Sequence, residues 1–113
     1  EYTPRTSALM AEMFAKAFAE EEITVVTGGP EIGQAFAGLA FDHLIFTGAA
    51  NVARHVMRAA ADNLVPLTLE LGGKSPVIVG RSADLATATA RIMNGKTLNA
   101  GQICLAPDYV ITP

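Results

Sequence analysis

Along the whole chain, short apolar runs alternate with segments in which apolar residues recur at about every fourth position. Recurrence at that spacing indicates helices, and short apolar runs bounded by glycine or proline indicate strands. The apolar runs are continuous, which is typical of strands that are covered on both faces. Strands that alternate with helices in this way predict an α/β fold, with helices on the two faces of a parallel sheet.

The first helix should begin at Thr3-Pro4, because Thr3 can cap it and Pro4 suits the first helical position. Asp84 can cap the last helix. Helices are expected over 7–20, 31–38 and 51–62 and from Asp84 toward 97, and strands over 23–27, 43–47, 68–71, 76–79 and 109–111. The last strand leaves the sheet unfinished, and a parallel sheet with bare edges is a poor stand-alone object. We therefore expect an internal piece of a larger enzyme.

The composition places the chain among globular proteins, since 50% of its 113 residues are hydrophobic and 17% are charged. The net charge of −3 is too mild and too acidic for a nucleic-acid partner to be expected. A single cysteine excludes an internal disulfide, gives no metal-site spacing and favours a reducing, cytoplasmic location. No apolar run reaches the ~18 residues of a membrane span, and the polar opening at Glu1 is unlike a signal peptide.

Cys104, the only cysteine, lies in the run GQIC at 101–104. A thiolate is a strong nucleophile, and a loop that contains Gly101 lets main-chain N–H groups approach a carbonyl under attack. A lone cysteine is more often a buried structural residue, so both roles stay open on this residue alone.

Glu70 lies in the run LELGGKSP at 69–76, near the end of the strand expected over 68–71. The carboxyl ends of parallel strands are where ligand crevices open. A desolvated setting there would suit a carboxylate that acts as a general base. The alternative is a carboxylate that accepts hydrogen bonds from the glycine turn, and the glycine pair fits either role.

Two glycine-bearing turns can face a nucleotide. The run GAANVA (48–53) joins a strand to a helix, whose free N–H groups and partial positive charge can hold a phosphate. By itself, however, an ordinary strand–helix turn is the simpler explanation. The run GGPEIG (28–33) is either a loop or one lip of a nucleotide groove. Arg54, Arg58 and Lys74 could meet a phosphate, although solvated charges are the default.

Taken together, these runs resemble the aldehyde dehydrogenase family over the whole chain. The opening EYTP (1–4) is similar to the end of the family's Lys-Pro-Ser/Ala-Glu-x-Thr-Pro segment, and FTG (46–48) to its cofactor-phosphate turn. LELGGKSP (69–76) and GQIC (101–104) resemble its general-base and nucleophile signatures. Within the family, RHVMR (54–58) and CLAPDYV (104–110) are most similar to the coniferyl aldehyde dehydrogenase branch.

The resemblance implies a partial, Rossmann-like aldehyde dehydrogenase fold. Residues 1–72 would be the C-terminal part of the NAD-binding domain, and residues 73–113 the N-terminal part of the catalytic domain. It implies that Cys104 attacks the aldehyde, that hydride passes to the nicotinamide, and that Glu70 activates water to hydrolyse the thioester to the acid. The substrate would be coniferyl or another aromatic aldehyde. The main-chain N–H of Cys104 would supply half of the oxyanion hole.

The resemblance also implies NAD as the cofactor. Glu1 matches the glutamate that holds the adenosine ribose, and a carboxylate there repels a 2′-phosphate, which disfavours NADP. Further cofactor contacts are implied for Gly29, Gly33, Gly48, Ala49, Ala53 and Leu71. Two residues depart from the family pattern. Many members have Ser in place of Ala49, to bond the pyrophosphate, and many have Gly in place of Ala53.

Two alternatives remain. The chain could come from a truncated, non-catalytic copy of such an enzyme, or from a relative that passes the thioester to coenzyme A. A base at the position of Glu70 is typically absent from such acylating relatives. The parent enzyme is expected to be a homodimer or homotetramer. The 113-residue chain alone is expected to be inactive, because its pockets would lack walls.

Overall fold

The computed structural model describes residues 2–113, which form two compact units. The first unit comprises the chain up to Leu44 together with Arg54–Leu67, and the second comprises Ile45–Ala53 and Thr68–Pro113. Glu1 lies outside the described residues, so its contact with a ribose stays a prediction. The boundary at 72/73 between a cofactor domain and a catalytic domain likewise stays a prediction.

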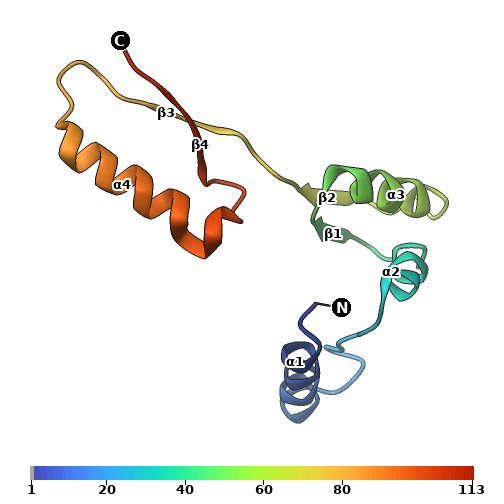
Figure 1. The fold of residues 1–113 in the computed structure, drawn as a ribbon. Coiled ribbons are helices and arrows are strands. Elements are labelled where there is room, and N and C mark those ends of the chain that lie inside the picture. Colours follow the sequence, from blue (N-terminus) through green and yellow to red (C-terminus); the bar gives the residue numbers. More distant parts are fainter. Residues whose placement is uncertain (1) are drawn as a thin grey trace. The chain divides into compact units, whose positions relative to one another are not determined.

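Helices and strands alternate as the sequence predicts, with one exception (Figure 1). The helices are α1 (Pro4–Ala17), α2 (Pro30–Ala37), α3 (Ala50–Ala61), α4 (Leu85–Thr97) and the short 3-10 helix η1 (Leu98–Gly101). The strands are β1 (Leu44–Thr47), β2 (Leu67–Glu70), β3 (Ser75–Ile78) and β4 (Pro107–Ile111). Strand β4 begins two residues earlier than expected, at Pro107. The ring of Pro107 lies close to Gly95 of α4.

The ends of α1 differ in detail from the prediction. Pro4 occupies the first turn as expected, but the Thr3 side chain makes no capping hydrogen bond. The main-chain oxygen of Thr3 instead accepts from the Ser7 N–H at 3.0 Å. The helix ends at Ala17, because Phe18 is extended and the Ala19 N–H donates to the Glu22 carboxylate at 3.0 Å. A side chain that bonds the main chain locally offers an alternative to the helical ladder, and the helix stops there.

The strand predicted over 23–27 is wrong. This segment is not paired into a sheet in the described part of the chain. The Ile23 N–H donates to the Ala19 carbonyl at 3.1 Å, which closes a turn, and Val26 is 54% exposed. An apolar run becomes a strand only when a neighbour completes its hydrogen-bond ladder, and periodicity alone cannot show whether that neighbour is present.

Small apolar side chains form the core of the first unit. Ala37 of α2, Val56 and Ala60 of α3, and Val65 after it are all buried. The end of α3 is joined to the end of α2 by a hydrogen bond from Asn63 Nδ2 to the Gly38 carbonyl at 2.8 Å. The buried residues of α3 recur at spacings of three and four, so the helix is held by burial on one face.

The strands pair in parallel, which confirms the predicted arrangement. In the second unit, β3 pairs in parallel with β4. Strands β1 and β2 also pair, through Leu44 N–H to Pro66 O and Gly48 N–H to Glu70 O, each at 3.0 Å. From the first bond to the second, the donor moves forward from Leu44 to Gly48 and the acceptor moves forward equally from Pro66 to Glu70. Both strands therefore run in the same direction, as parallel pairing requires.

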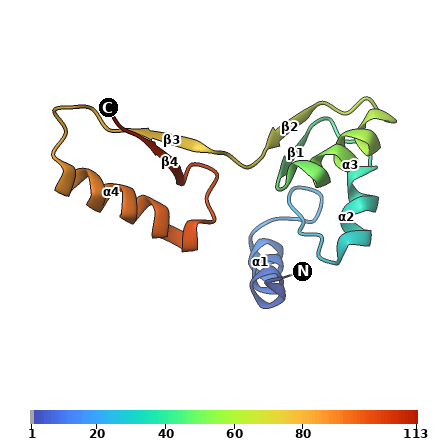
Figure 2. The same ribbon diagram turned by 45° about the horizontal axis from the view of Figure 1, so that its top comes forward.

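The expectation that both sheet faces are covered is wrong within residues 2–113. In β1, β2 and β3, half-buried side chains alternate with exposed ones, and Ile45 and Ile78 are 67% and 76% exposed. In Figure 2, α4 lies along one face of the β3–β4 pair. The continuous hydrophobic runs of β1 and β3 arise because apolar residues lie on both faces of these strands. Such a run shows that both faces are suited to burial, but it does not show that a helix covers each of them.

Helix α4 begins as predicted, with Asp84 as its cap. The carboxylate accepts from the N–H groups of Ala86 and Thr87, both at 3.2 Å, and from the Thr87 hydroxyl. Hydrogen bonds from the Thr87 side chain, the Thr87 N–H and the Ala86 N–H hold the pKa of Asp84 below its ordinary value. Further along α4, a Cβ on Gly95 would lie 3.4 Å from the Pro107 ring, so the helix packs closely on β4. No helix in residues 2–113 is long and apolar enough to cross a membrane.

Candidate active site

The second unit contains a shallow, open depression with a volume of about 320 Å³. Three loops line it: the end of β1, the segment after β2, and the segment that follows α4. The lining residues are Thr47, Gly48, Glu70, Leu71, Gly72, Gly73, Gly101, Gln102, Ile103 and Cys104. The structure therefore brings together four of the predicted site residues: Gly48, Glu70, Leu71 and Cys104.

Glu70 is placed by strand pairing. It is the last residue of β2, and its main-chain carbonyl accepts from the Gly48 N–H at 3.0 Å. This bond links the turn predicted to hold a phosphate directly to the predicted general base. The Glu70 side chain is exposed, so the desolvated setting expected at this position is wrong for residues 2–113. Glu70 thus lines the depression and is open to water.

Gly73 and Cys104 meet through their backbones. A Cβ on Gly73 would lie only 2.4 Å from the Cys104 carbonyl oxygen, closer than real Cβ atoms approach. The second glycine of LELGGKSP is therefore required by the approach of another loop, and not only by a tight turn. This contact joins the loop that carries Glu70 to the loop that carries Cys104.

The nucleophile loop is built from unusual backbone conformations. Asn99, Ala100 and Gly101 have φ of 50°, 55° and 79° in succession, all in the left-handed region. Glycine adopts this conformation freely, whereas alanine does so at a cost of about 1–2 kcal/mol. The Gln102 N–H closes the turn on the Asn99 carbonyl at 3.1 Å. Cys104 follows with a free and exposed thiol, which excludes the alternative of a buried structural cysteine in the described chain.

The turn after β1 leads into α3, where the sequence predicts a phosphate site. The first N–H bonded within the helix is that of Ala53, which donates to the Ala49 carbonyl at 3.0 Å. The N–H groups ahead of it lie outside the helical ladder and can point at an anion. A Cβ on Gly48 would lie 2.6 Å from the Phe46 ring, so a larger residue at the turn would need the ring to move. Ala49 offers no hydroxyl, and Ala53 is 2% exposed, so neither side chain can donate a hydrogen bond to a phosphate here.

Gly29 and Gly33 lie in the first unit. Gly29 precedes α2 as its N-cap residue, and Gly33 lies inside the helix, where a Cβ would meet no atom within 4 Å. Neither glycine is demanded by local packing, and their contacts with a nucleotide stay predictions.

Lys74, Lys96 and Asp108 form an ion-pair cluster that the sequence did not predict. Lys74 Nζ donates to Asp108 Oδ1 at 3.2 Å, and Lys96 Nζ lies 3.9 Å from the same oxygen. Lys74 was expected to be solvated or to meet a phosphate. The signal that could have found the pair is spacing, because Lys74 follows Glu70 by four residues and Asp108 follows Cys104 by four. Among residues 2–113, no cluster of His, Cys, Asp and Glu could hold a metal ion.

Comparison with known sequences identifies one family. The model of the aldehyde dehydrogenase family matches residues 1–113. The chain is 76% identical over 113 residues to a probable coniferyl aldehyde dehydrogenase of Caulobacter vibrioides and 66% identical to the coniferyl aldehyde dehydrogenase of a Pseudomonas species. All of this chain is covered, but only 23% and 24% of those proteins. The chain thus spans about a quarter of the length of these curated relatives.

Solved structures show the same likeness. A substrate-bound state of Staphylococcus aureus AldH superposes with a TM-score of 0.90 at 44% identity, over 97% of this chain and 24% of that one. A betaine aldehyde dehydrogenase of Staphylococcus aureus in complex with NAD⁺ gives a TM-score of 0.71 at 35% identity, over 78% of this chain and 18% of that one. The predicted α/β fold, as a partial match to these larger chains, is thereby confirmed.

Proposed function

Because this chain belongs to the aldehyde dehydrogenase family, we propose that the protein carrying it oxidises an aldehyde to the carboxylic acid with NAD, using Cys104 as the nucleophile and Glu70 as the general base. The observation that carries the proposal is that these two residues line one open depression, and that the segment after Glu70 meets the Cys104 backbone at Gly73. The reaction needs both groups to act on one carbon atom in turn, and a shared depression is the arrangement that permits it.

Cys104 acts first. Its thiolate attacks the aldehyde carbon, a C–S bond forms, and the carbonyl oxygen becomes the oxyanion of a thiohemiacetal. The left-handed turn over 99–101 leaves the main-chain N–H groups around Cys104 outside any regular ladder, where one can donate to that oxyanion. The exposed thiol is accessible to an aldehyde without any rearrangement of the loop.

The main-chain groups at the start of α3, with the Gly48 turn, would hold the pyrophosphate of NAD. NAD, when bound, supplies the acceptor for the hydride that leaves the thiohemiacetal carbon. Since the Glu70 carbonyl accepts from the Gly48 N–H, a main-chain hydrogen bond links the proposed phosphate turn to the proposed base. Ala49 has no hydroxyl to donate, so main-chain N–H groups would make the pyrophosphate contacts at this position.

Glu70 acts last. Its carboxylate takes a proton from water, the water oxygen attacks the thioester carbon, and the C–S bond breaks to return the Cys104 thiolate and release the acid. The presence of a carboxylate here supports hydrolysis over transfer to coenzyme A. Its exposure to solvent in the described chain also gives water direct access.

We further propose coniferyl aldehyde, or another aromatic aldehyde, as the substrate. The support is the high identity to proteins named coniferyl and probable coniferyl aldehyde dehydrogenase.

NAD is proposed over NADP because a carboxylate at Glu1 would repel a 2′-phosphate. The solved complex of a relative with NAD⁺ supports a nicotinamide cofactor. A cytoplasmic enzyme that works as a homodimer or homotetramer is proposed on family grounds.

The test uses the longest natural reading frame that contains this chain, assayed with coniferyl and simple aliphatic aldehydes and with NAD and NADP in parallel. Cys104→Ala is expected to lower kcat/KM by more than about 10³-fold. Glu70→Gln is expected to keep one rapid burst of NADH and then to turn over roughly 10²-fold more slowly, because hydride transfer precedes hydrolysis.

Glu12→Gln serves as the matched control, since Glu12 is an exposed carboxylate on α1, outside the site. Full activity of Cys104→Ala would contradict the proposal. A product that appears as the coenzyme A thioester would replace hydrolysis by acyl transfer. Absence of any NAD-dependent oxidation by the wild type would indicate a non-catalytic relative.

A further inference from the structure

The β3–β4 ladder is irregular beside the candidate site. Ser75 pairs with Pro107, whereas the next residue, Pro76, pairs with Tyr109. Asp108 is therefore the extra residue of a β-bulge, with no partner of its own across the ladder. Bulges are uncommon between parallel strands, and next to active sites they serve to re-aim a side chain.

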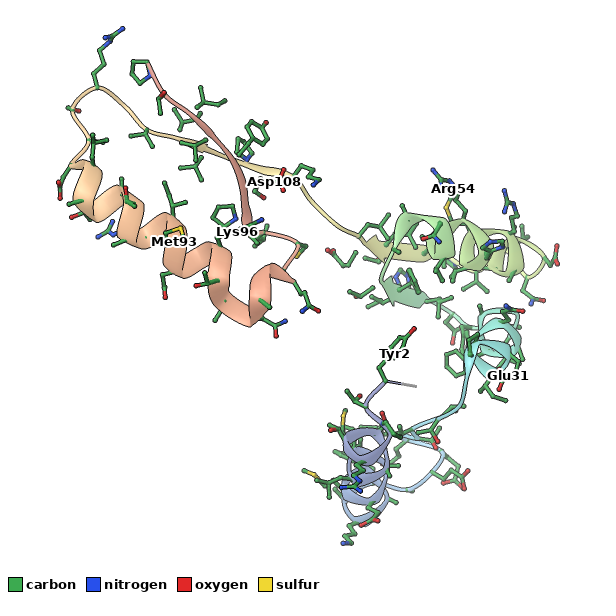
Figure 3. All side chains as sticks on the ribbon, in the orientation of Figure 1. Tyr2, Glu31, Arg54, Met93, Lys96 and Asp108 are labelled. Atoms are coloured by element: carbon green, nitrogen blue, oxygen red, sulfur yellow. The ribbon has the colours of Figure 1, made fainter. Side chains whose placement is uncertain are left out.

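The side chain that this bulge re-aims is the Asp108 carboxylate, which Lys74 and Lys96 approach from two other segments. Lys74 lies between β2 and β3, in the loop of Glu70, and its Nζ is 3.2 Å from Asp108 Oδ1. Lys96 lies in the last turn of α4, ahead of the nucleophile loop, and its Nζ is 3.9 Å from that oxygen. Figure 3 shows Lys96 and Asp108 on α4 and β4.

These contacts connect the two reactive loops at both ends of one short segment. Gly73 touches the Cys104 carbonyl, and the next residue, Lys74, bonds Asp108, which follows Cys104 by four positions. The segment 104–108 is thus held against 73–74 at its first and last residues. Because Cys104 takes part in the first contact and Glu70 lies three residues before Gly73, the distance between Cys104 and Glu70 depends on both contacts.

We propose that Asp108, with Lys74 as its main partner and Lys96 as a weaker one, is a positioning residue that holds the Cys104 loop against the Glu70 loop for thioester hydrolysis. The inference rests on the proposed function. Thiol attack and hydride loss need Cys104 and the cofactor, whereas hydrolysis alone needs Glu70, water and the Cys104-bound carbon in one arrangement. Loosening the ion pair should therefore slow the hydrolytic step and spare the earlier ones.

The expected size of the effect follows from exposure. The Lys74 and Asp108 side chains are 80% and 31% exposed, and ion pairs this accessible add little to global stability. Positioning is more sensitive than stability, since a misplacement of about 1 Å can cost ~10²-fold in rate. A partly loosened loop should cost less than that, about fivefold to tenfold in turnover.

The test compares Asp108→Asn, Lys74→Gln and their double variant in the same natural reading frame, with two readouts. In rapid-mixing assays, each single variant should keep the NADH burst and lower steady-state turnover by about fivefold to tenfold. The double variant should be no slower than the slower single variant, because the two changes remove one interaction. Lys96→Gln should give a smaller decrease. Arg81→Gln, which removes an exposed cation from the loop after β3, should match the wild type.

Amide hydrogen exchange over residues 98–106 provides the second readout, which needs no activity. Asp108→Asn and Lys74→Gln should speed exchange there, and Arg81→Gln should not. Wild-type exchange in both variants overturns the inference. A burst and a steady-state rate that fall in proportion also overturn it, since the residues would then be structural only. If the wild type oxidises no aldehyde, the proposed function fails. The exchange rates of the two variants, compared with the wild type, would still show whether the ion pair holds the loop.

Discussion

At the scale of single residues, backbone approach is as informative as side-chain chemistry. Cys104 and Glu70 are the residues proposed to react, but Gly73 limits how closely their segments can meet. The sequence marks Gly73 only as part of a glycine pair, and a glycine pair fits any tight turn. The actual demand comes from the Cys104 carbonyl, which belongs to a loop about 30 residues further along the chain.

Gly73→Ala should therefore be harmful where Gly80→Ala is not. The added methyl would lie 2.4 Å from the Cys104 carbonyl oxygen, so the two loops must separate. Turnover of the natural full-length protein should fall by about tenfold or more, because the two reactive groups then lose their shared geometry. Gly80→Ala is the matched control, since a Cβ there meets no atom within 4 Å. Equal activity of the two variants in a steady-state NADH assay would disprove the role of this contact.

At the scale of elements, caps and pairings explain where each helix and strand begins and ends. Asp84 starts α4 as expected, because its carboxylate can bond two N–H groups of the first turn. The segment 23–27 has the composition of a strand but no ladder in residues 2–113, so composition alone misled the prediction. A helix cap can be predicted from sequence because the residues it bonds are close by in the chain. A strand needs a pairing partner that is usually distant in the chain, so its formation is harder to predict.

The Asp84 cap should make α4 sensitive to acid. Its pKa is lowered below the ordinary value of 3.8 by bonds that only the folded helix provides. A lowered folded-state pKa contributes stability that is present above the ordinary value and is lost as the pH falls through the folded value. Helical circular dichroism should therefore decrease below about pH 4 more in the wild type than in Asp84→Asn, which caps without titrating. Parallel acid curves for the two proteins would contradict this assignment.

At the scale of the whole molecule, the described chain buries little. Its buried side chains are Ala37, Ala53, Val56, Ala60, Val65, Val79 and Ala106, none larger than valine. Large apolar side chains such as Leu105 and Ile78 are 77% and 76% exposed. Burial of apolar area is the main favourable term in folding, so these 113 residues alone have little to offset their conformational entropy.

The purified 113-residue chain is accordingly expected to unfold without a sharp transition and to produce no NADH from aldehydes. Thermal circular dichroism and binding of a hydrophobic dye would report the loose packing, and absorbance of NADH would report activity. Cooperative unfolding together with measurable NADH production by this chain would show that it folds and acts by itself.

The sequence by itself determined the family, the parallel α/β pattern and the α4 cap, and it supplied the two residues proposed to react. These depend on residue type and on spacing along the chain, which are complete in the sequence. Only the tertiary structure decided that Gly73 meets Cys104, that Asp108 is a bulge residue bonded to Lys74, and that Glu70 is exposed. Each of these depends on which distant segments lie against each other, and the free energy of such contacts arises only when the chain has folded.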